Sequence, residues 1–447
     1  MTRGFSTRSL HAGAEPDSAT GARATPIHQT TSYVFDDADT AAEMYALRAE
    51  GHIYSRLSNP TVNVLEDRLA DLSGGSDAVA TGSGMAAFDA ITTVLASAGD
   101  NVVASSEMYG GTAAYLTSIA DRRGIEARLV DTLDYEAYAD AIDGDTAFVH
   151  VETIANPSLV TPDFERLADI AHDHAVPLVV DNTFATPYLC RPFEHGADIT
   201  WESTTKWITG NGTTVGGVVV DSGQFPWDHP DADYDELDGE SSAFPINFVE
   251  QFGDAAFANV VRQRGVRPIG GQQSPFDAWQ TIQGLNTLPL RMERHCENAR
   301  RVAEFLRDDE RVDWVSYPGF EDHQSHGNAA EYLDGFGGMV TFGVDGGYEA
   351  AKTFCESVEL TSFLANIGDA KTLVIHPSST THAQMDEEQQ RLAGVYPEML
   401  RLSIGIEDPE DVIADLDAGL AAGERAADGE SADEESADGA DTGGEGA

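Results

Sequence analysis

The stretch Asp198-Ile199-Thr200-Trp201-Glu202-Ser203-Thr204-Thr205-Lys206-Trp207 is an apolar run that passes into a hydroxyl-rich turn carrying one lysine. The apolar part predicts a buried strand. The hydroxyls of Ser203 and Thr205 can donate hydrogen bonds to a phosphate, and the Lys206 amine can form an imine with an aldehyde. A lysine that follows a strand is more often an ordinary surface residue, so this stretch alone leaves both interpretations open.

The scarcity of lysine elsewhere favours the chemical interpretation of Lys206. Lys352 and Lys371 are the only other lysines, and arginine supplies the remaining 23 of the 26 basic residues. A guanidinium does not lose its proton in proteins, so arginine cannot replace a lysine that must act as an imine-forming amine. A chain that has replaced almost every other lysine therefore points to a chemical role for this one.

Charge and composition exclude several classes of protein. The 447 residues include 77 acidic and 26 basic side chains, a formal net charge of −51. Residues 422–447 hold nine acids and one arginine, a net −8, so −43 belongs to the rest of the chain. This charge opposes nucleic-acid binding. No apolar run approaches the roughly 18 residues of a membrane span, and the first ten residues lack the apolar stretch of a signal peptide, so we expect a soluble cytoplasmic protein.

Cysteine and histidine spacings predict neither disulfides nor a metal site. Cys190, Cys296 and Cys355 are odd in number and lack CxxC spacing, so we expect reduced thiols. The histidine pairs 172/174 and 323/326 lack the spacing of known metal motifs, and we expect them to be solvated.

Apolar strand-like runs alternate with helical stretches along most of the chain. This alternation predicts an α/β fold with a mostly parallel sheet covered by helices. The predicted strands are 101–104, 147–151, 177–180, 198–201 and 217–220, and the predicted helices are 85–96, 112–122, 164–174 and 288–306.

Four segments are expected. Residues 1–58 contain few periodic segments and predict an arm. A large domain would occupy 59–290, starting with a helix capped by Asn59, with Pro60 at its first position and Gly74 at its end. A polar stretch at 221–242 is interpreted as a loop inserted in this domain. A smaller α/β domain would occupy 291–421, and the acidic tail 422–447 is too poor in apolar residues to fold.

Asp181 stands at the end of the predicted strand 177–180. In open α/β sheets, ligands bind at the carboxyl ends of the strands. A carboxylate there can pair with a protonated pyridine nitrogen and make the ring an electron sink. Asp181 alone is equally well explained as a helix cap.

The segment 81–87, Thr-Gly-Ser-Gly-Met-Ala-Ala, opens a helix, and its small residues allow backbone N–H groups to approach a phosphate. It also fits the dinucleotide pattern GxGxxA, so an NAD-dependent oxidoreductase is the alternative from a different class. That alternative requires a strand just before the segment and an acidic residue at the end of the next strand, and it leaves Lys206 unexplained. Tyr109, in Tyr109-Gly110-Gly111, could stack its ring on a cofactor or could simply begin a turn.

Taken together, these motifs make the chain resemble the Cys/Met-metabolism family of pyridoxal-phosphate enzymes from about residue 5 to 420. Within the family, the insertion after Phe225 and the Asn366-Ile367-Gly368 segment resemble the O-acetylhomoserine sulfhydrylase branch. Asn211 departs from the family pattern, because many relatives have histidine there. The matching segments are 53–61, 82–87, 109–112, 181–187, 203–207, 283–295 and 366–377.

The resemblance implies a fold of the aspartate-aminotransferase type (fold type I) and a role for each matched residue. Lys206 would hold pyridoxal 5′-phosphate, Asp181 would pair with its ring nitrogen, and Tyr109 would cover its face and act in catalysis. Arg401 would take the substrate carboxylate, and Asn156 would lie near the cofactor oxygen and the substrate. The implied phosphate ligands are Gly84, Met85, Ser203 and Thr205, joined by Tyr54 and Arg56 from the neighbouring subunit of a dimer or tetramer; Tyr54 would also face the substrate.

The implied reaction is γ-replacement on O-acetyl-L-homoserine with sulfide or methanethiol, giving homocysteine or methionine and acetate. The alternatives within the family are cystathionine γ-synthase, cystathionine γ-lyase and methionine γ-lyase. The acidic composition also resembles that of proteins from halophilic archaea, which predicts a salt-requiring enzyme.

Overall fold

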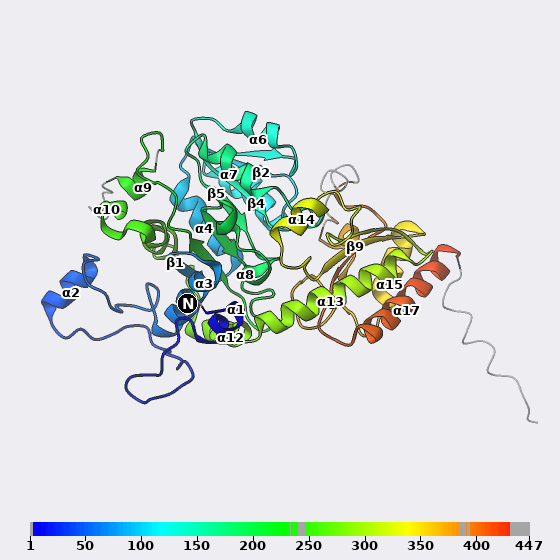
Figure 1. The fold of residues 1–447 in the computed structure, drawn as a ribbon, viewed down its shortest axis with the longest axis horizontal. Helices are drawn as coiled ribbons and strands as arrows, with labels where there is room; N and C mark the ends of the chain where they lie inside the picture. The colour runs from blue at the N-terminus through cyan, green and yellow to red at the C-terminus, as the bar shows by residue number, and fades with distance from the viewer. Residues whose placement is uncertain are drawn as a thin grey trace, which may run out of the picture.

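The computed structural model describes residues 3–232, 234–239, 246–381 and 394–429, together with residues 383, 386 and 390. Two sheets divide the chain into a large and a small domain (Figure 1). The N-terminal arm carries α1 (Phe5–His11) and α2 (Ala38–Tyr45), and α2 extends from the large domain on the side away from the second sheet.

The large domain contains a seven-stranded sheet in the order β1-β7-β6-β5-β4-β2-β3. The five strands from β6 to β3 are parallel, and β7 is antiparallel to both of its neighbours, β1 and β6. The predicted mostly parallel sheet is therefore confirmed. The strands are β1 (Asp77–Thr81), β2 (Asn101–Ser105), β3 (Glu126–Val130), β4 (Thr146–Glu152), β5 (Leu178–Asp181), β6 (Ile199–Glu202) and β7 (Gly217–Asp221).

Helices pack on both faces of this sheet, as the α/β prediction requires. The predicted cap is confirmed in α3 (Pro60–Ser73), because Asn59 accepts a hydrogen bond from the Thr61 amide and Gly74 ends the helix with φ +78°. The other main helices are α4 (Gly84–Leu95), α5 (Gly110–Ala114), which continues as a π-helix (Tyr115–Ala120), α6 (Tyr135–Ala141), α7 (Phe164–His172) and α12 (Pro275–Leu285). The insertion predicted at 221–242 contains the short helix α9 (Asp235–Asp238), and part of it lies outside the described residues.

Helix α13 (Leu288–Arg307) links the large domain to the small one (Figure 1). The boundary predicted at 290/291 therefore falls inside a continuous helix. The small domain has a five-stranded sheet in the order β10-β11-β12-β9-β8, antiparallel except between β10 and β11. Its strands are β8 (Val312–Ser316), β9 (Met339–Val344), β10 (Ser362–Phe363), β11 (Leu373–Ile375) and β12 (Met399–Ser403), and its helices are α14 (His326–Tyr332), α15 (Gly347–Ser357) and α17 (Pro409–Ala427).

The tail boundary at 422 needs correction. Helix α17 continues to Ala427 because Leu416, Leu420 and Gly423 are buried along it, with Gly423 against Ala350 of α15. The remainder of the predicted tail, from residue 430, lies outside the described residues.

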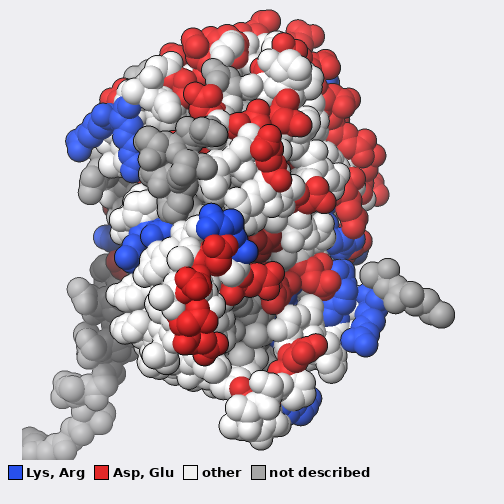
Figure 2. Space-filling model, turned by 90° about the vertical axis from the view of Figure 1, so that its left-hand side faces the viewer, with Lys and Arg blue, Asp and Glu red and all other residues white. Residues whose placement is uncertain are grey.

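Surface charge agrees with the composition. In Figure 2, Asp and Glu side chains are spread over much of the visible face and far outnumber Lys and Arg. Cys190 and Cys355 are buried, Cys296 is partly buried, and all three are free thiols, as predicted. No helix in the described part of the chain is both long and apolar enough to cross a membrane.

Candidate active site

The topology of the large sheet brings the predicted motifs to one edge. Strands β1 and β6 both run antiparallel to β7, which lies between them, so their carboxyl ends point the same way. The turn after β1 carries Gly84, the turn after β6 carries Lys206, and β5 ends at Asp181 on the same edge. These three residues are separated by up to 122 positions in the sequence, so it is the order of the strands in the sheet that brings them to one edge.

The turn after β1 is packed too tightly against its neighbours to accept larger side chains. A Cβ on Gly84 would lie 2.8 Å from the Ser203 Cβ, and a Cβ on Gly217 would lie 2.3 Å from the Ser83 carbonyl oxygen. Ser83 caps α4 by accepting from the Ala86 amide, which leaves the amides of Gly84 and Met85 ahead of the first intrahelical bonds. Two backbone donors at a helix N-terminus beside a serine form an arrangement suited to an anionic phosphate.

Ser203, Thr205 and Lys206 lie in the turn predicted to follow the strand. The Ser203 amide donates to Thr183 Oγ1 at 2.8 Å, which ties this turn to the one after β5. Thr205 Oγ1 accepts from the Gly216 amide at 3.0 Å. Asn211, the position that departs from the family pattern, donates from Nδ2 to the Thr209 carbonyl and has no direct part in this cluster.

Lys206 is partly buried at this edge, and its Nζ donates to Asn366 Oδ1 at 2.6 Å. Burial, reinforced by the nearby charge of Arg401, lowers the pKa of Lys206 to about 8. With this pKa about a tenth of the amine is neutral at pH 7, far more than for an ordinary lysine, and the neutral amine is the form that makes an imine. Asn366 belongs to the small domain, so the site is formed between the two domains.

Asp181 is buried at the end of β5, and its Oδ1 accepts from the Thr183 amide at 2.9 Å. Burial raises the pKa of this carboxyl to about 7, against the lowering effect of the Thr183 hydrogen bonds. A cation placed beside Asp181 would restore its charged form. A protonated pyridine nitrogen is such a cation, so the residue fits the pairing that the sequence predicted.

Arg401 lies on β12, the central strand of the small sheet, and its Nη1 donates to Asn156 Oδ1 at 2.9 Å. Its Nε is buried with no hydrogen-bond partner among the described residues. Burial lowers the pKa of this guanidinium to about 10. A buried guanidinium with an unused donor suits a carboxylate ligand, which would supply the missing charge and the missing acceptor.

Tyr109 precedes α5 and is half-exposed, with its ring against Gly111, where a Cβ would lie 2.4 Å from the ring. Glu152, a residue that sequence reasoning missed, accepts a hydrogen bond from the Tyr109 amide at 2.6 Å. The sequence could have indicated Glu152, because it ends the apolar run of β4 just as Asp181 ends the apolar run of β5. Asn366 was quoted only as part of a motif, because nothing local indicates that it reaches Lys206.

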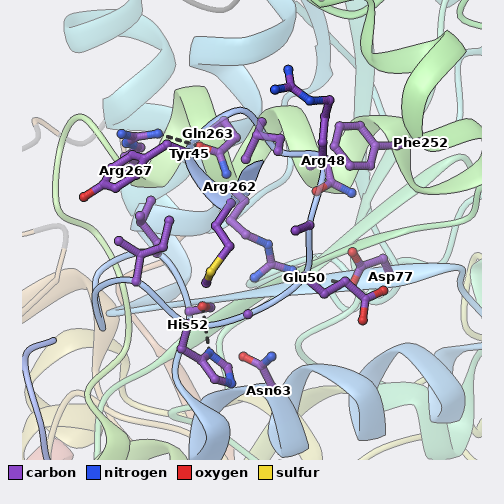
Figure 3. Close-up of a pocket in the computed structure, with 18 of the residues that line it drawn as sticks. Tyr45, Arg48, Glu50, His52, Asn63, Asp77, Phe252, Arg262, Gln263 and Arg267 are labelled. Atoms are coloured by element: carbon purple, nitrogen blue, oxygen red, sulfur yellow. Dashed lines mark hydrogen bonds and ion pairs between the residues drawn. The ribbon is translucent and has the colours of Figure 1, made fainter. Parts of the chain in front are cut away.

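Tyr54 and Arg56 do not join this cluster within one chain. The guanidinium of Arg56 donates to the Arg267 carbonyl, and it lies 5.5 Å from the centre of the Tyr54 ring. A pocket of about 690 Å³ lies between the arm and the large domain. Figure 3 shows the side chains that line it. Its lining includes His52, Arg262 and Arg267 but none of Lys206, Asp181 or Arg401, so the pocket is separate from the candidate site.

The dinucleotide pattern at 81–87 has a strand before it, which the sequence analysis did not predict. However, β1 is an edge strand whose neighbour in the sheet is the antiparallel β7, and β2 ends in Ser105 rather than an acidic residue. His172 Nε2 donates to Asp198 Oδ2 at 2.8 Å, which is a structural contact near the start of β6.

Comparison with known proteins agrees with this geometry. The family described as Cys/Met metabolism PLP-dependent enzymes matches residues 6–421. The chain is 47% identical over 415 residues to a homocysteine synthase from Schizosaccharomyces pombe, covering 92% of this chain and 97% of that protein. It is 45% identical over 421 residues to O-acetyl-L-homoserine sulfhydrylase 1 from Thermus thermophilus, covering 93% and 100%.

A solved structure shows the same fold. The crystal structure of a putative O-acetylhomoserine (thiol)-lyase from Campylobacter jejuni, which carries N′-pyridoxyl-lysine-5′-monophosphate, superposes with a TM-score of 0.90 at 36% identity, covering 94% of this chain and all of that one. The prediction of a pyridoxal-phosphate fold is confirmed, and the NAD-dependent alternative is wrong. The chain belongs to the Cys/Met metabolism family of PLP-dependent enzymes.

Proposed function

We propose that this enzyme catalyses γ-replacement on O-acetyl-L-homoserine with sulfide, producing L-homocysteine and acetate. The observation that carries the proposal is the convergence of a partly buried lysine and a buried strand-end aspartate at one edge of the large sheet, with a partly buried arginine of the small domain close enough for its charge to act on that lysine. Relatives named homocysteine synthase or O-acetyl-L-homoserine sulfhydrylase, 43–47% identical over more than nine-tenths of the chain, support the choice of substrate.

The cofactor would be held by the residues described above. Lys206 is the proposed attachment point, Asp181 the partner of the ring nitrogen, and Tyr109 the ring that covers it. The phosphate would be bound by Gly84 and Met85 through their amides and by Ser203 and Thr205 through their hydroxyls. When bound, pyridoxal phosphate supplies an aldehyde that condenses with the substrate amine and a ring that withdraws electrons from the substrate α-carbon.

The protein's own groups then bind the substrate and move its protons. Arg401 and Asn156 would hold the substrate carboxylate, which fixes the Cα–H bond relative to Lys206. Lys206 Nζ, an amine of lowered pKa, would take the Cα proton. Loss of a Cβ proton would then let acetate leave Cγ with the electron pair of the broken C–O bond, and sulfide would add to Cγ in its place. Return of one proton to Cβ and one to Cα would complete L-homocysteine. Asn366 would hold Lys206 Nζ in position through the 2.6 Å hydrogen bond.

We also propose that two subunits complete each site. The arm exposes large apolar side chains that its own chain does not cover, including Val34, which is 100% exposed, together with Tyr45 and Tyr54. Burial of these side chains against a second copy would favour a dimer, in which Tyr54 and Arg56 would reach the phosphate and substrate of the neighbouring site. A pair of such dimers would form the expected tetramer. The high density of surface carboxylates supports a salt-requiring enzyme, and the expected cytoplasmic location stays a prediction.

Product analysis tests the reaction directly. Purified enzyme loaded with pyridoxal phosphate is supplied with O-acetyl- or O-succinyl-L-homoserine and with sulfide, methanethiol or cysteine, and the products are separated by mass. O-acetyl-L-homoserine with sulfide is expected to react fastest. Faster formation of cystathionine would assign the enzyme to the cystathionine γ-synthase group, and oxo-acid release without a thiol would indicate a γ-lyase.

A further inference from the structure

Glu152 is the last residue of β4 and is buried, with 4% of its surface exposed. Its two carboxylate oxygens accept hydrogen bonds from two different loops. Oε1 accepts from the Tyr109 amide at 2.6 Å, and Oε2 accepts from the Asn156 amide at 2.9 Å. Tyr109 follows β2 and Asn156 follows β4, so one carboxylate joins the two loops above neighbouring strands.

Each loop carries a residue with a proposed role at the reaction site. The Asn156 side chain accepts from Arg401 Nη1 at 2.9 Å, so the hydrogen bonds run from Glu152 through Asn156 to the guanidinium proposed to bind the substrate carboxylate. Tyr109 is the proposed cover of the cofactor ring. Glu152 itself lies beneath these loops, paired in register with Asp181 of the next strand.

Burial of Glu152 is costly, which argues for a specific purpose. Desolvation, reinforced by the neighbouring charge of Asp181, raises the pKa of Glu152 well above its ordinary value, and the two backbone hydrogen bonds oppose that rise. Hydrogen bonds from backbone amides to a carboxylate are about twice as strong as neutral ones. An uncharged side chain of the same size would be easier to bury but could not accept from both amides.

From this geometry we infer that Glu152 is a positioning residue that sets substrate affinity by holding Asn156, and through it Arg401, while holding Tyr109 over the cofactor. The inference rests on the proposed function of Arg401 and Asn156. It adds that the positions of Arg401 and Asn156 depend on Glu152, a residue beneath their loops to which no direct contact with substrate or cofactor is assigned.

The chain offers a matched control for the loss of a buried carboxylate. Glu202 also ends a strand, β6, is 0% exposed, and neighbours Asp181. Its Oε1 accepts from Asn182 Nδ2 at 3.1 Å, whereas its Oε2 has no partner among the described residues. Glu202→Gln therefore makes the same substitution of a buried carboxyl group without touching the loops of Tyr109 and Asn156.

Glu152→Gln leaves one acceptor oxygen and presents an N–H₂ group to the other amide. We expect the dissociation constant of L-methionine, measured from the change in the visible spectrum of the loaded enzyme, to rise about tenfold or more. The KM for O-acetyl-L-homoserine should rise by a similar factor, with a smaller change in kcat. Glu202→Gln should change both constants less than about threefold.

A double-mutant cycle with Asn156→Ala tests the route of the effect. If Glu152 acts through Asn156, Glu152→Gln should weaken L-methionine binding less than about threefold in the Asn156→Ala background. An equal factor in both backgrounds, or equal effects of Glu152→Gln and Glu202→Gln, would overturn the inference. Should Glu152→Gln fail to fold, Glu152→Asp keeps the carboxyl group but withdraws both oxygens, and an unchanged dissociation constant in that variant would likewise overturn it.

The binding titration also separates this inference from the proposed reaction. L-Methionine binding requires no turnover. An enzyme that binds pyridoxal phosphate and L-methionine but does not convert O-acetyl-L-homoserine with sulfide would refute the proposed reaction, and the titrations of the Glu152 variants would still decide the role of Glu152.

Discussion

Arg401 provides a prediction in which substrate affinity and protein stability should change in opposite directions. Among the described residues of the protein without substrate, this guanidinium has one hydrogen-bond partner, the neutral side chain of Asn156, and its buried Nε has none. Burial lowers its pKa to about 10. At about 1.4 kcal/mol for each tenfold change in an ionisation equilibrium, burial of the charge costs the folded protein about 3 kcal/mol.

Replacement by methionine removes this charge at similar volume. The substitution removes the cost of burying the charge, but it also leaves the Asn156 oxygen without its donor, which costs about 1 kcal/mol. Arg401→Met should therefore be at least as stable as wild type and up to about 2 kcal/mol more stable. Substrate binding should suffer strongly, because two charge-assisted hydrogen bonds of about 1.5–3 kcal/mol each are lost, which corresponds to a decrease of about 10²- to 10⁴-fold in kcat/KM.

The assay combines thermal unfolding of the substrate-free enzyme with steady-state kinetics for O-acetyl-L-homoserine. Arg68→Met is the control, because Arg68 is also a buried arginine, has no carboxylate partner among the described residues, and donates to the Ala12 carbonyl and to Asn286. This control should leave kcat/KM within about threefold of wild type. A stable Arg401→Met enzyme with wild-type KM would refute the role assigned to Arg401, and a strongly destabilised one would refute the argument that its burial opposes folding.

Three further predictions concern assembly, salt and pH. Arg56→Ala and Lys206→Ala subunits should each be inactive alone, but mixed dimers contain one intact site and should regain activity; no recovery despite demonstrated subunit exchange would mean that each site is built within one chain. Because a Debye length of about 3 Å at 1 M salt screens the repulsion among surface carboxylates, thermal stability should rise from millimolar to molar KCl, and a flat or falling curve would remove the halophilic proposal. The rate at which the cofactor-free protein takes up pyridoxal phosphate should rise as pH increases through about 8, where Lys206 becomes neutral, and then level off; a rate that does not change between pH 6 and 9 would contradict the lowered pKa of Lys206.

The central strands were predictable because they are buried on both faces and appear as continuous apolar runs. All five predicted strands are present to within one or two residues, as are helices α3 and α13. Strands β1 and β3, at the two edges of the large sheet, were missed. Strand β3 has the sequence Glu-Ala-Arg-Leu-Val, with partly exposed positions, so it has no apolar run to detect.

The site was predictable where its residues stand at strand ends and not where it depends on contacts between domains. Lys206 and Asp181 follow apolar runs that mark their position in the sheet. The contact of Lys206 with Asn366 and that of Arg401 with Asn156 join segments 160 and 245 residues apart. No local pattern encodes such contacts, and the tail boundary was wrong because the burial that extends α17 comes from α15, far away in the sequence.

The central claim is that Lys206 carries the cofactor, and peptide mapping after reduction tests it most directly. Purified enzyme loaded with pyridoxal phosphate is reduced with borohydride, digested and examined by mass spectrometry, beside a Lys206→Arg variant treated in the same way. We predict that wild type carries the phosphopyridoxyl group on the peptide containing Lys206, and that the variant loses this modification together with its visible absorbance and its turnover. Stoichiometric modification of Lys352 or Lys371 instead, or a variant that retains wild-type absorbance, would contradict the account.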